Sequence, residues 1–424
     1  MTTPENTGVP VSVQLDSTPL VAVLVLVFGI AAFGTDMYQP AIPAIRRAFD
    51  TTATAVQWSL SIFLYGNALG HLIFGAWSDR CGRKPVLLLG LAAFAAASYG
   101  CAMASDITEF MVYRLAQGAA AASGPVLVRA LINDCLTRDL AAQKLALLTG
   151  FMAFAAMLTP SVGGWMVQHQ SWQWIFYALG SGSVLLLIAA AAIIPETLPR
   201  ARRIETLKPT ALTRSYLAIA GDLRFWCYAA PPALMFAGVF AYAAVNSFLL
   251  IGELGMAAQH HGIIYSVAAC AFAAGSLMGR RLVQICGIDS TIVIGLTLGC
   301  VAAFIAVVAS SLLPLSIALV VVPGLCVFFS TALVIPIALS TAVSLFPSVG
   351  GSASALVGFV QLVLAGLSSG IAAILYNATT LPLHLFTLGC CLGAALIWIA
   401  GGRYRRATIR EDFPNAIKIN HEGH

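Results

Sequence analysis

Long apolar stretches constrain this chain more than any other feature, because they recur from one end to the other with only short polar breaks between them. Each approaches the roughly 20 residues that a helix needs to cross a bilayer. The stretches are continuous and do not alternate apolar with polar residues, which favours helices over the strands of a membrane barrel. We therefore predict an all-α integral membrane protein with twelve transmembrane helices, at about 20–44, 55–77, 86–103, 107–131, 145–167, 172–194, 225–250, 262–282, 291–310, 315–339, 352–375 and 383–400.

The composition agrees with lipid as the main solvent. The chain has 424 residues, of which 59% are hydrophobic and 9% charged, whereas a soluble domain carries roughly 25% charged residues. Basic residues form small clusters at predicted helix ends and not one basic face, so nucleic-acid binding is not expected. The ten cysteines are scattered without metal-ligand spacing, which predicts small buried side chains and neither a metal nor a cofactor.

Lysine and arginine predict the orientation, because cytoplasmic loops are enriched in both. Residues 1–18 contain neither, so they lack the basic start of a cleaved signal peptide, and the first apolar stretch is expected to remain as a span. If both termini are cytoplasmic, the outward loops hold only Arg46 and Arg47. The inward segments then hold Arg80, Arg83, Lys84, Arg138, Lys144, Arg200, Arg202, Arg203, Lys208, Arg214, Arg280, Arg281, Arg403, Arg405, Arg406, Arg410 and Lys418.

The longest polar break lies in the middle of the chain and predicts a division into two halves. We expect an N-terminal six-helix half at 1–195, a cytoplasmic linker at 196–224, a C-terminal six-helix half at 225–402 and a cytoplasmic tail at 403–424. A faint repeat agrees with duplication, since Gly75 and Arg80 recur as Gly275 and Arg280. Equal halves favour a transporter whose substrate site lies between them.

Two charged residues are expected well inside the spans, where charge is costly. At ~1.5 Å per helical residue, Asp36 lies about 24 Å from the inner boundary and Arg114 about 10 Å from the outer start of its span. Desolvation raises the pKa of a carboxyl and a nearby cation lowers it. We therefore expect Asp36 to load and release a proton, with Arg114 tuning it. The alternative is a static ion pair, or a helix-breaking polar cluster beside Pro40 and Pro43.

Other polar and aromatic side chains in the spans are candidates for a substrate cavity. Asn67 and His71 lie four residues apart and share one helix face. Such residues also bond to neighbouring helices, and most aromatic residues in membrane proteins serve packing or the interface, so both alternatives stay open. The candidates are Tyr38, Tyr65, Asn67, His71, Phe236, Phe240, Asn246 and Gln361.

The segment 75–85, GAWSDRCGRKP, resembles the signature loop of the major facilitator superfamily between its second and third spans. Gly82 permits a tight turn, and the basic residues anchor the loop at the cytoplasmic face. The alternative is an ordinary positively charged loop. The resemblance implies a gate on the cytoplasmic side, formed by Gly75, Asp79, Gly82, Arg83 and Lys84.

Four further segments resemble the Bcr/CflA drug/proton antiporter subfamily. They are DMYQPAIP at 36–43, RLAQG at 114–118, TPSVGG at 159–164 and PETL at 195–198. The resemblance implies that Asp36 and Arg114 act in proton coupling, and that Pro160, Gly163 and Gly164 shape the fifth helix. The chain departs from the pattern at Ala155 and Thr159, where glycines are usual, and at Phe28, where some antiporters carry a second acid.

The expected function is proton-coupled efflux of small amphipathic or neutral drugs or toxic metabolites, with cationic drugs as poorer substrates. The expected location is the inner membrane of a bacterium. A small molecule, protons and the bilayer are the expected partners, the protein is expected to be monomeric, and no enzymatic activity is predicted. The alternatives are a proton-coupled uptake symporter for a sugar or other nutrient, and a membrane receptor or membrane-embedded enzyme.

Overall fold

The computed structural model describes residues 18–404 apart from 137, 201–202, 204–208 and 347–349. Within the helices, the side chains of 138–139, 141–143, 146, 149–156, 209–212 and 215 also lie outside the description. The basic positions Arg202, Lys208, Arg405, Arg406, Arg410 and Lys418 fall outside the described residues, as do the side chains of Arg138 and Ala155.

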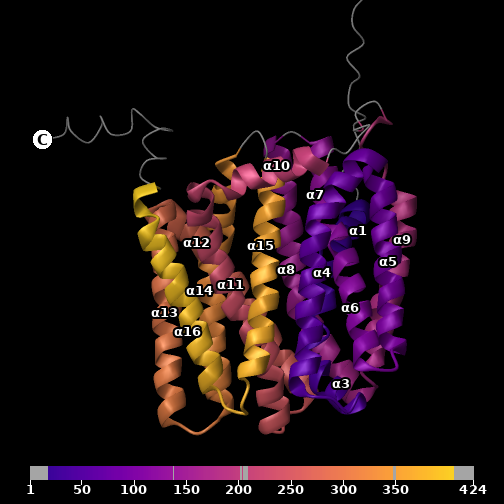
Figure 1. Ribbon diagram of the computed structural model, residues 1–424. Coiled ribbons are helices and arrows are strands. Elements are labelled where there is room, and N and C mark those ends of the chain that lie inside the picture. The colour runs from indigo at the N-terminus through magenta and orange to yellow at the C-terminus, as the bar shows by residue number, and fades with distance from the viewer. Residues whose placement is uncertain (1–17, 137, 201–202, 204–208, 347–349, 405–424) are drawn as a thin grey trace, which may run out of the picture.

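The described chain is helical throughout and its long helices run roughly along one axis (Figure 1). No β-strand occurs in the part of the chain that the structure describes. The elements are α1 (Thr18–Phe28), α2 (Ile30–Asp36), η1 (Gln39–Ala41), α3 (Ile42–Ala48), α4 (Ala53–Cys81), α5 (Arg83–Met103), α6 (Ile107–Ala121), α7 (Ser123–Cys135), α8 (Arg138–His169), α9 (Gln173–Ile193), α10 (Pro209–Ala220), α11 (Leu223–Ser247), η3 (Phe248–Glu253), α12 (Ala258–Cys286), α13 (Ile288–Leu312), α14 (Ile317–Ser344), α15 (Gly350–Leu375) and α16 (Leu381–Ala400).

The lengths and apolarity of these helices confirm a multi-pass membrane fold. Ten spans are long and apolar enough to cross a bilayer, among the residues described, and the bent pair Thr18–Phe28 and Ile30–Ala48 makes an eleventh. The fifth predicted stretch, 145–167, falls on α8, a helix of 32 residues whose side chains are only partly described. The count of twelve spans therefore stays a prediction.

The helices form two groups that lie side by side (Figure 1). The N-terminal group contains α1–α9 and the C-terminal group contains α11–α16. They meet mainly where α4 packs on α15 and where α8 packs on α12. We call the end of the bundle that carries α10 the linker end, and the end that carries α3 the far end.

Close approach of backbones marks the contact between α8 and α12. A Cβ atom added to Gly164 would collide with the Ala258 carbonyl, and one added to Gly262 would collide with the Pro160 carbonyl. Lipid gives helices little hydrophobic reason to associate, so such interfaces depend on small residues that let backbones touch. These two glycines therefore hold the groups together at the level of the predicted fifth-span motif.

The first span differs from the continuous stretch predicted at 20–44. α1 stops at Phe28, α2 ends at Asp36, and a 3-10 turn leads into α3, with a bend of 47° between α1 and the following pair of helices. Pro40 and Pro43 lack backbone N–H groups and so cannot continue the hydrogen-bond ladder of an α-helix. The break after Asp36 leaves that residue as the last one of α2, whereas the 47° bend lies earlier, at Gly29.

The linker contains a helix that the sequence did not lead us to expect. α10 begins at Pro209, a residue favoured in the first turn of a helix because it needs no N–H partner there. It crosses the linker end and contacts α11 and α15 (Figure 1). Asp222 then caps α11 by accepting a hydrogen bond from the Arg224 backbone N–H at 2.8 Å.

Candidate functional site

Asp36 occupies the end of α2 and lies inside the bundle. Its side chain is partly exposed, although protein surrounds it on most sides. The Thr35 hydroxyl donates a hydrogen bond to Oδ1 at 3.2 Å. Among the described residues, no basic side chain lies within ion-pair distance of Asp36. A carboxyl at bilayer depth without a cation partner is costly in its ionised form, which suits it to carrying a proton.

Arg114 is fully buried on α6 and has an unusual set of partners. Its Nη1 donates to the Gly34 carbonyl at 3.1 Å and to Gln117 Oε1 at 2.6 Å. Its Cζ lies 4.4 Å from the ring centroid of Tyr38 and 4.3 Å from that of Phe63. Ring faces and a carbonyl therefore stabilise a charge for which the described part of the chain supplies no carboxylate.

Arg114 and Asp36 lie at the same level but on different faces of α2. Gly34 and Tyr38, which contact Arg114, are four residues apart and share one face of the helical backbone. Asp36 lies two residues from each, so it points to the opposite side. The static ion pair considered from the sequence is not observed among the described side chains, and any influence of Arg114 on Asp36 passes through the α2 backbone.

The residues that follow Asp36 connect the two helix groups. Gln39 donates a hydrogen bond from Nε2 to the Tyr265 hydroxyl of α12 at 3.2 Å. A Cβ atom at Gly163 of α8 would collide with the Met37 carbonyl, so α8 packs directly against the broken segment. Asp36 therefore lies beside the contact between the groups, and not in the interior of one group.

Contacts between the groups concentrate at the far end. Four hydrogen bonds between described residues cross from one group to the other, and each involves residues in the far half of its helices. The Thr54 hydroxyl donates to the Ala373 carbonyl at 3.3 Å, and Gln57 Nε2 donates to the Ala244 carbonyl at 2.8 Å. At the linker end, α1 and α7 pack mainly against helices of their own group. The far end is thus closed in this conformation.

The predicted cavity residues divide into two sets. Tyr38 and Asn246 are buried in internal contacts, Tyr38 beneath Arg114 and Asn246 accepting from His261 Nε2 at 2.9 Å if that nitrogen carries the proton. Asn67 is buried too, and its Oδ1 has no partner among the described residues. The partly exposed candidates are Tyr65, His71, Phe236, Phe240 and Gln361.

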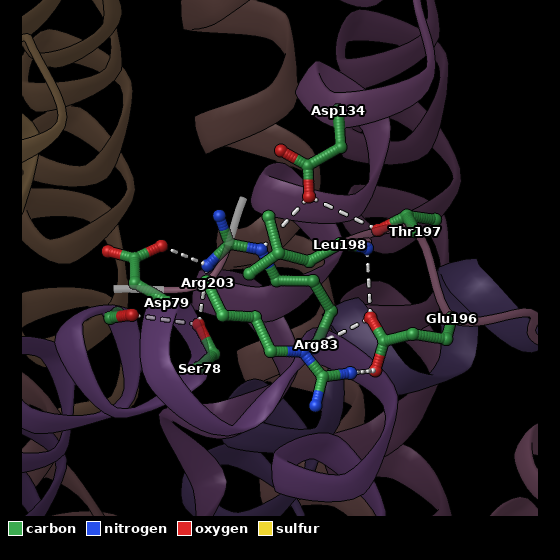
Figure 2. A network of polar contacts seen from close by, with 9 residues as sticks. Ser78, Asp79, Arg83, Asp134, Glu196, Thr197, Leu198 and Arg203 are labelled. Carbon is green, nitrogen blue, oxygen red and sulfur yellow. Dashed lines mark hydrogen bonds and ion pairs between the residues drawn. The ribbon is translucent and has the colours of Figure 1, made fainter. Parts of the chain in front are cut away.

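The predicted gating loop forms a polar network at the linker end (Figure 2). Arg83 pairs with Asp79 at 2.5 Å and with Asp134 of α7 at 3.0 Å. Its backbone N–H donates to Glu196 Oε1 at 3.0 Å, and the Thr197 hydroxyl donates to Asp134 at 3.1 Å. The network therefore joins the start of α5, the end of α7 and the beginning of the linker.

Gly82 allows this network to form because it is the only residue between α4 and α5. Its φ of +102° lies in a region that residues with side chains rarely adopt. A Cβ there would also collide with the Glu196 carboxylate. Lys84 follows and donates to the Ala191 carbonyl at 2.7 Å. Gly75 lies in a more open place, with only a Val126 methyl within 4 Å of an added Cβ atom.

Two features of the site escaped the sequence analysis. Arg129 was passed over because it lies near the end of the predicted stretch 107–131, although it falls within the span Ile107–Cys135. A count of charged residues in the stretch 107–131 would have found it. Asp134, the partner of Arg83, could not be recognised in this way because nothing in a single sequence links the two positions.

Comparisons with known proteins agree with the architecture. The family model described as Major Facilitator Superfamily matches residues 24–370. A bicyclomycin resistance protein homolog of Haemophilus influenzae is 27% identical, over 87% of this chain and 93% of its own. Multidrug resistance protein D of Escherichia coli is 25% identical, over 95% and 97%. The crystal structure of a D-xylose–proton symporter, at 15% identity, is similar with a TM-score of 0.70, over 90% of this chain and 97% of that one.

Proposed function

The chain belongs to the Major Facilitator Superfamily, and from that membership we propose that it exports small amphipathic or neutral drugs or toxic metabolites in exchange for protons. Relatives named for bicyclomycin resistance and multidrug resistance support export and a Bcr/CflA-type subfamily. We further propose a bacterial inner-membrane location with both termini cytoplasmic and a monomeric carrier. The linker end would then face the cytoplasm.

The placement of Asp36 is the observation that carries this proposal. The carboxyl lies at bilayer depth, at the end of a helix, beside the contact between the two groups and away from any cation of the described chain. A proton bound there removes a charge that lipid and protein solvate poorly. Rearrangement of the groups would change the exposure of the carboxyl, so protonation and conformation would be coupled.

The energetics allow export by one proton per cycle. A proton moving inward across about 100 mV releases about 2.3 kcal/mol, which supports a roughly fifty-fold uphill gradient of a neutral solute. Arg114 would hold the α2 backbone in place behind Asp36, through its bond to Gly34 and its contact with Tyr38. The network around Arg83 would hold the linker end of the N-terminal group together while the groups separate there.

We predict that Asp36→Asn abolishes proton-driven transport while the protein still reaches the membrane. Asparagine keeps the shape of the side chain but cannot exchange a proton near neutral pH. The measurement is ΔpH-driven accumulation of a chloramphenicol-type or bicyclomycin-type drug in everted membrane vesicles. The matched control is Asp50→Asn, which alters an exposed acid after α3 whose φ of 44° asparagine also accepts.

Normal accumulation by Asp36→Asn would refute the proton role of this residue. The direction of flux separates export from uptake, since an uptake symporter would drive solute out of everted vesicles along with the proton. The similarity to a D-xylose–proton symporter does not favour uptake, because at 15% identity it shows the fold alone.

A further inference from the structure

Arg129 is a charged residue inside the bundle that the proton site does not use. It lies on α7, and its Cζ is 5.7 Å from the ring centroid of Phe28 on α1. The side chain is exposed, although protein surrounds it on most sides. A lipid-facing side chain would be exposed and not surrounded, and a core side chain would be surrounded and not exposed. The combination places Arg129 on the wall of an internal space.

The charge of Arg129 has no carboxylate partner in the part of the chain that the structure describes. Asp134, on the same helix, is held by Arg83 and Thr197. Asp36 follows Phe28 by eight residues, about 12 Å at the rise of a helix. Ionisable residues within a membrane span commonly mark the path of a substrate or ion.

The surroundings of Arg129 lie beside the contact between the groups. His71 lies on α4, which packs against α7, the helix that carries Arg129. A Cβ added to Gly358 of α15 would lie 3.1 Å from His71 Nδ1, so His71 reaches the other group. α1 and α7 themselves pack mainly within the N-terminal group. A molecule held between the groups could therefore contact Arg129, His71 and the ring of Phe28.

We propose that Arg129 binds the acidic group of the exported compound, so that the preferred substrates are amphipathic weak acids with a carboxylate or a similar planar anion. The planar fork of a guanidinium matches a carboxylate with two parallel hydrogen bonds, and the Phe28 ring lies 5.7 Å from Cζ of that fork. This inference rests on the proposed export function. It narrows the expected substrates from amphipathic or neutral compounds to amphipathic weak acids.

The test compares acids with their uncharged amides on the full-length protein in lipid nanodiscs. The probes are 2-naphthoate, 4-phenylbutyrate and indole-3-acetate, each paired with its primary amide, and equilibrium binding is measured at neutral pH. We expect each acid to bind roughly tenfold or more tightly than its amide, the gain of a charge-assisted hydrogen bond over a neutral one. Acids that bind no better than their amides would overturn the proposal.

The variant Arg129→Gln should lower the affinity for the acids by roughly tenfold or more and leave that for the amides almost unchanged. Arg129→Lys keeps the charge without the fork, so it should lose only part of the acid affinity. The matched control Arg47→Gln removes an exposed arginine in the last turn of α3 and should change neither affinity. An equal loss for acids and amides in Arg129→Gln would also overturn the proposal. If Arg129→Gln fails to fold, the lysine variant and the wild-type acid–amide difference decide the question.

Vesicle transport separates this inference from the proposed function. If Asp36→Asn still accumulates drug while Arg129→Gln loses only acid binding, proton-driven export fails and the acid site stands. If Asp36→Asn stops accumulation but the wild-type protein does not discriminate acids from amides, export stands and the acid site is wrong.

Discussion

Arg114 shows how a single residue can hold a charge inside a bilayer without an opposite charge. It is fully buried, and in the described chain it relies on three aromatic rings, one backbone carbonyl and one amide oxygen. Gln117 links Arg114 to α5, because its Nε2 donates to the Ser98 hydroxyl at 2.8 Å. The residue therefore organises α2, α4, α5 and α6 around one guanidinium.

We predict that Arg114→Lys destabilises the protein although the charge is kept. A lysine ammonium is a compact point charge that cannot lie flat against Tyr38 and Phe63 while bonding to Gly34 and Gln117. Each lost cation–π contact costs about 0.5–2 kcal/mol. The measurement is the Tm of the purified protein in detergent, with the exposed Arg47→Lys as the control. A Tm shift no larger than that of the control would show that the ring contacts contribute nothing.

At the scale of elements, the broken first span depends on its neighbour α8. Gly163 lies against the Met37 carbonyl, one residue after Asp36, so a direct backbone contact holds α8 against the break. The sequence motif TPSVGG marked this helix for close packing, and the structure adds that part of the contact is made with the Asp36 segment itself.

We predict that Gly163→Ala impairs transport, because the new Cβ forces α8 away from Met37 and moves the end of α2. Overpacking of this kind typically costs about 1–3 kcal/mol. The measurement is drug accumulation in everted vesicles together with Tm. Gly182→Ala in α9 is the matched control, since its Cβ would meet nothing within 4 Å and alanine is the better helix former. If the two alanine variants transport equally well, the contact does not position Asp36.

At the scale of the whole molecule, the closed far end is one of the conformations that alternating access requires. We predict that linking Thr54→Cys to Ala373→Cys with a short bifunctional thiol reagent stops transport, because these positions hold α4 to α15 where the groups must separate. A cysteine-free background is needed, since the chain has ten cysteines. Transport is measured in vesicles before and after linkage.

The matched control for that linkage lies within one group. Leu91→Cys and Ser183→Cys replace a pair joined by the same kind of bond, a hydroxyl donating to a backbone carbonyl at 2.8 Å, but both residues belong to the N-terminal group. Linking them should leave transport intact. Continued transport by the Thr54–Ala373 pair after complete linkage would show that the far end need not open there.

Much of the fold could be predicted because the bilayer sets the length and apolarity of each span, and both are visible along the chain. The break after Asp36 was harder to predict, since Pro40 and Pro43 show where a helix is disturbed but not how the chain bends. Contacts between distant helices, such as Gln39 with Tyr265 or Arg83 with Asp134, depend on which faces meet in space. A single sequence does not carry that information.

The close contact between the backbones of α8 and α12 has a consequence for how the two groups can move. Gly164 and Gly262 bring the two backbones into direct contact, and the Ser161 and Ser266 hydroxyls bond across the same interface at 2.8 Å. Because glycine has no side chain that must repack, we expect this contact to let the two groups rotate against each other while they stay together.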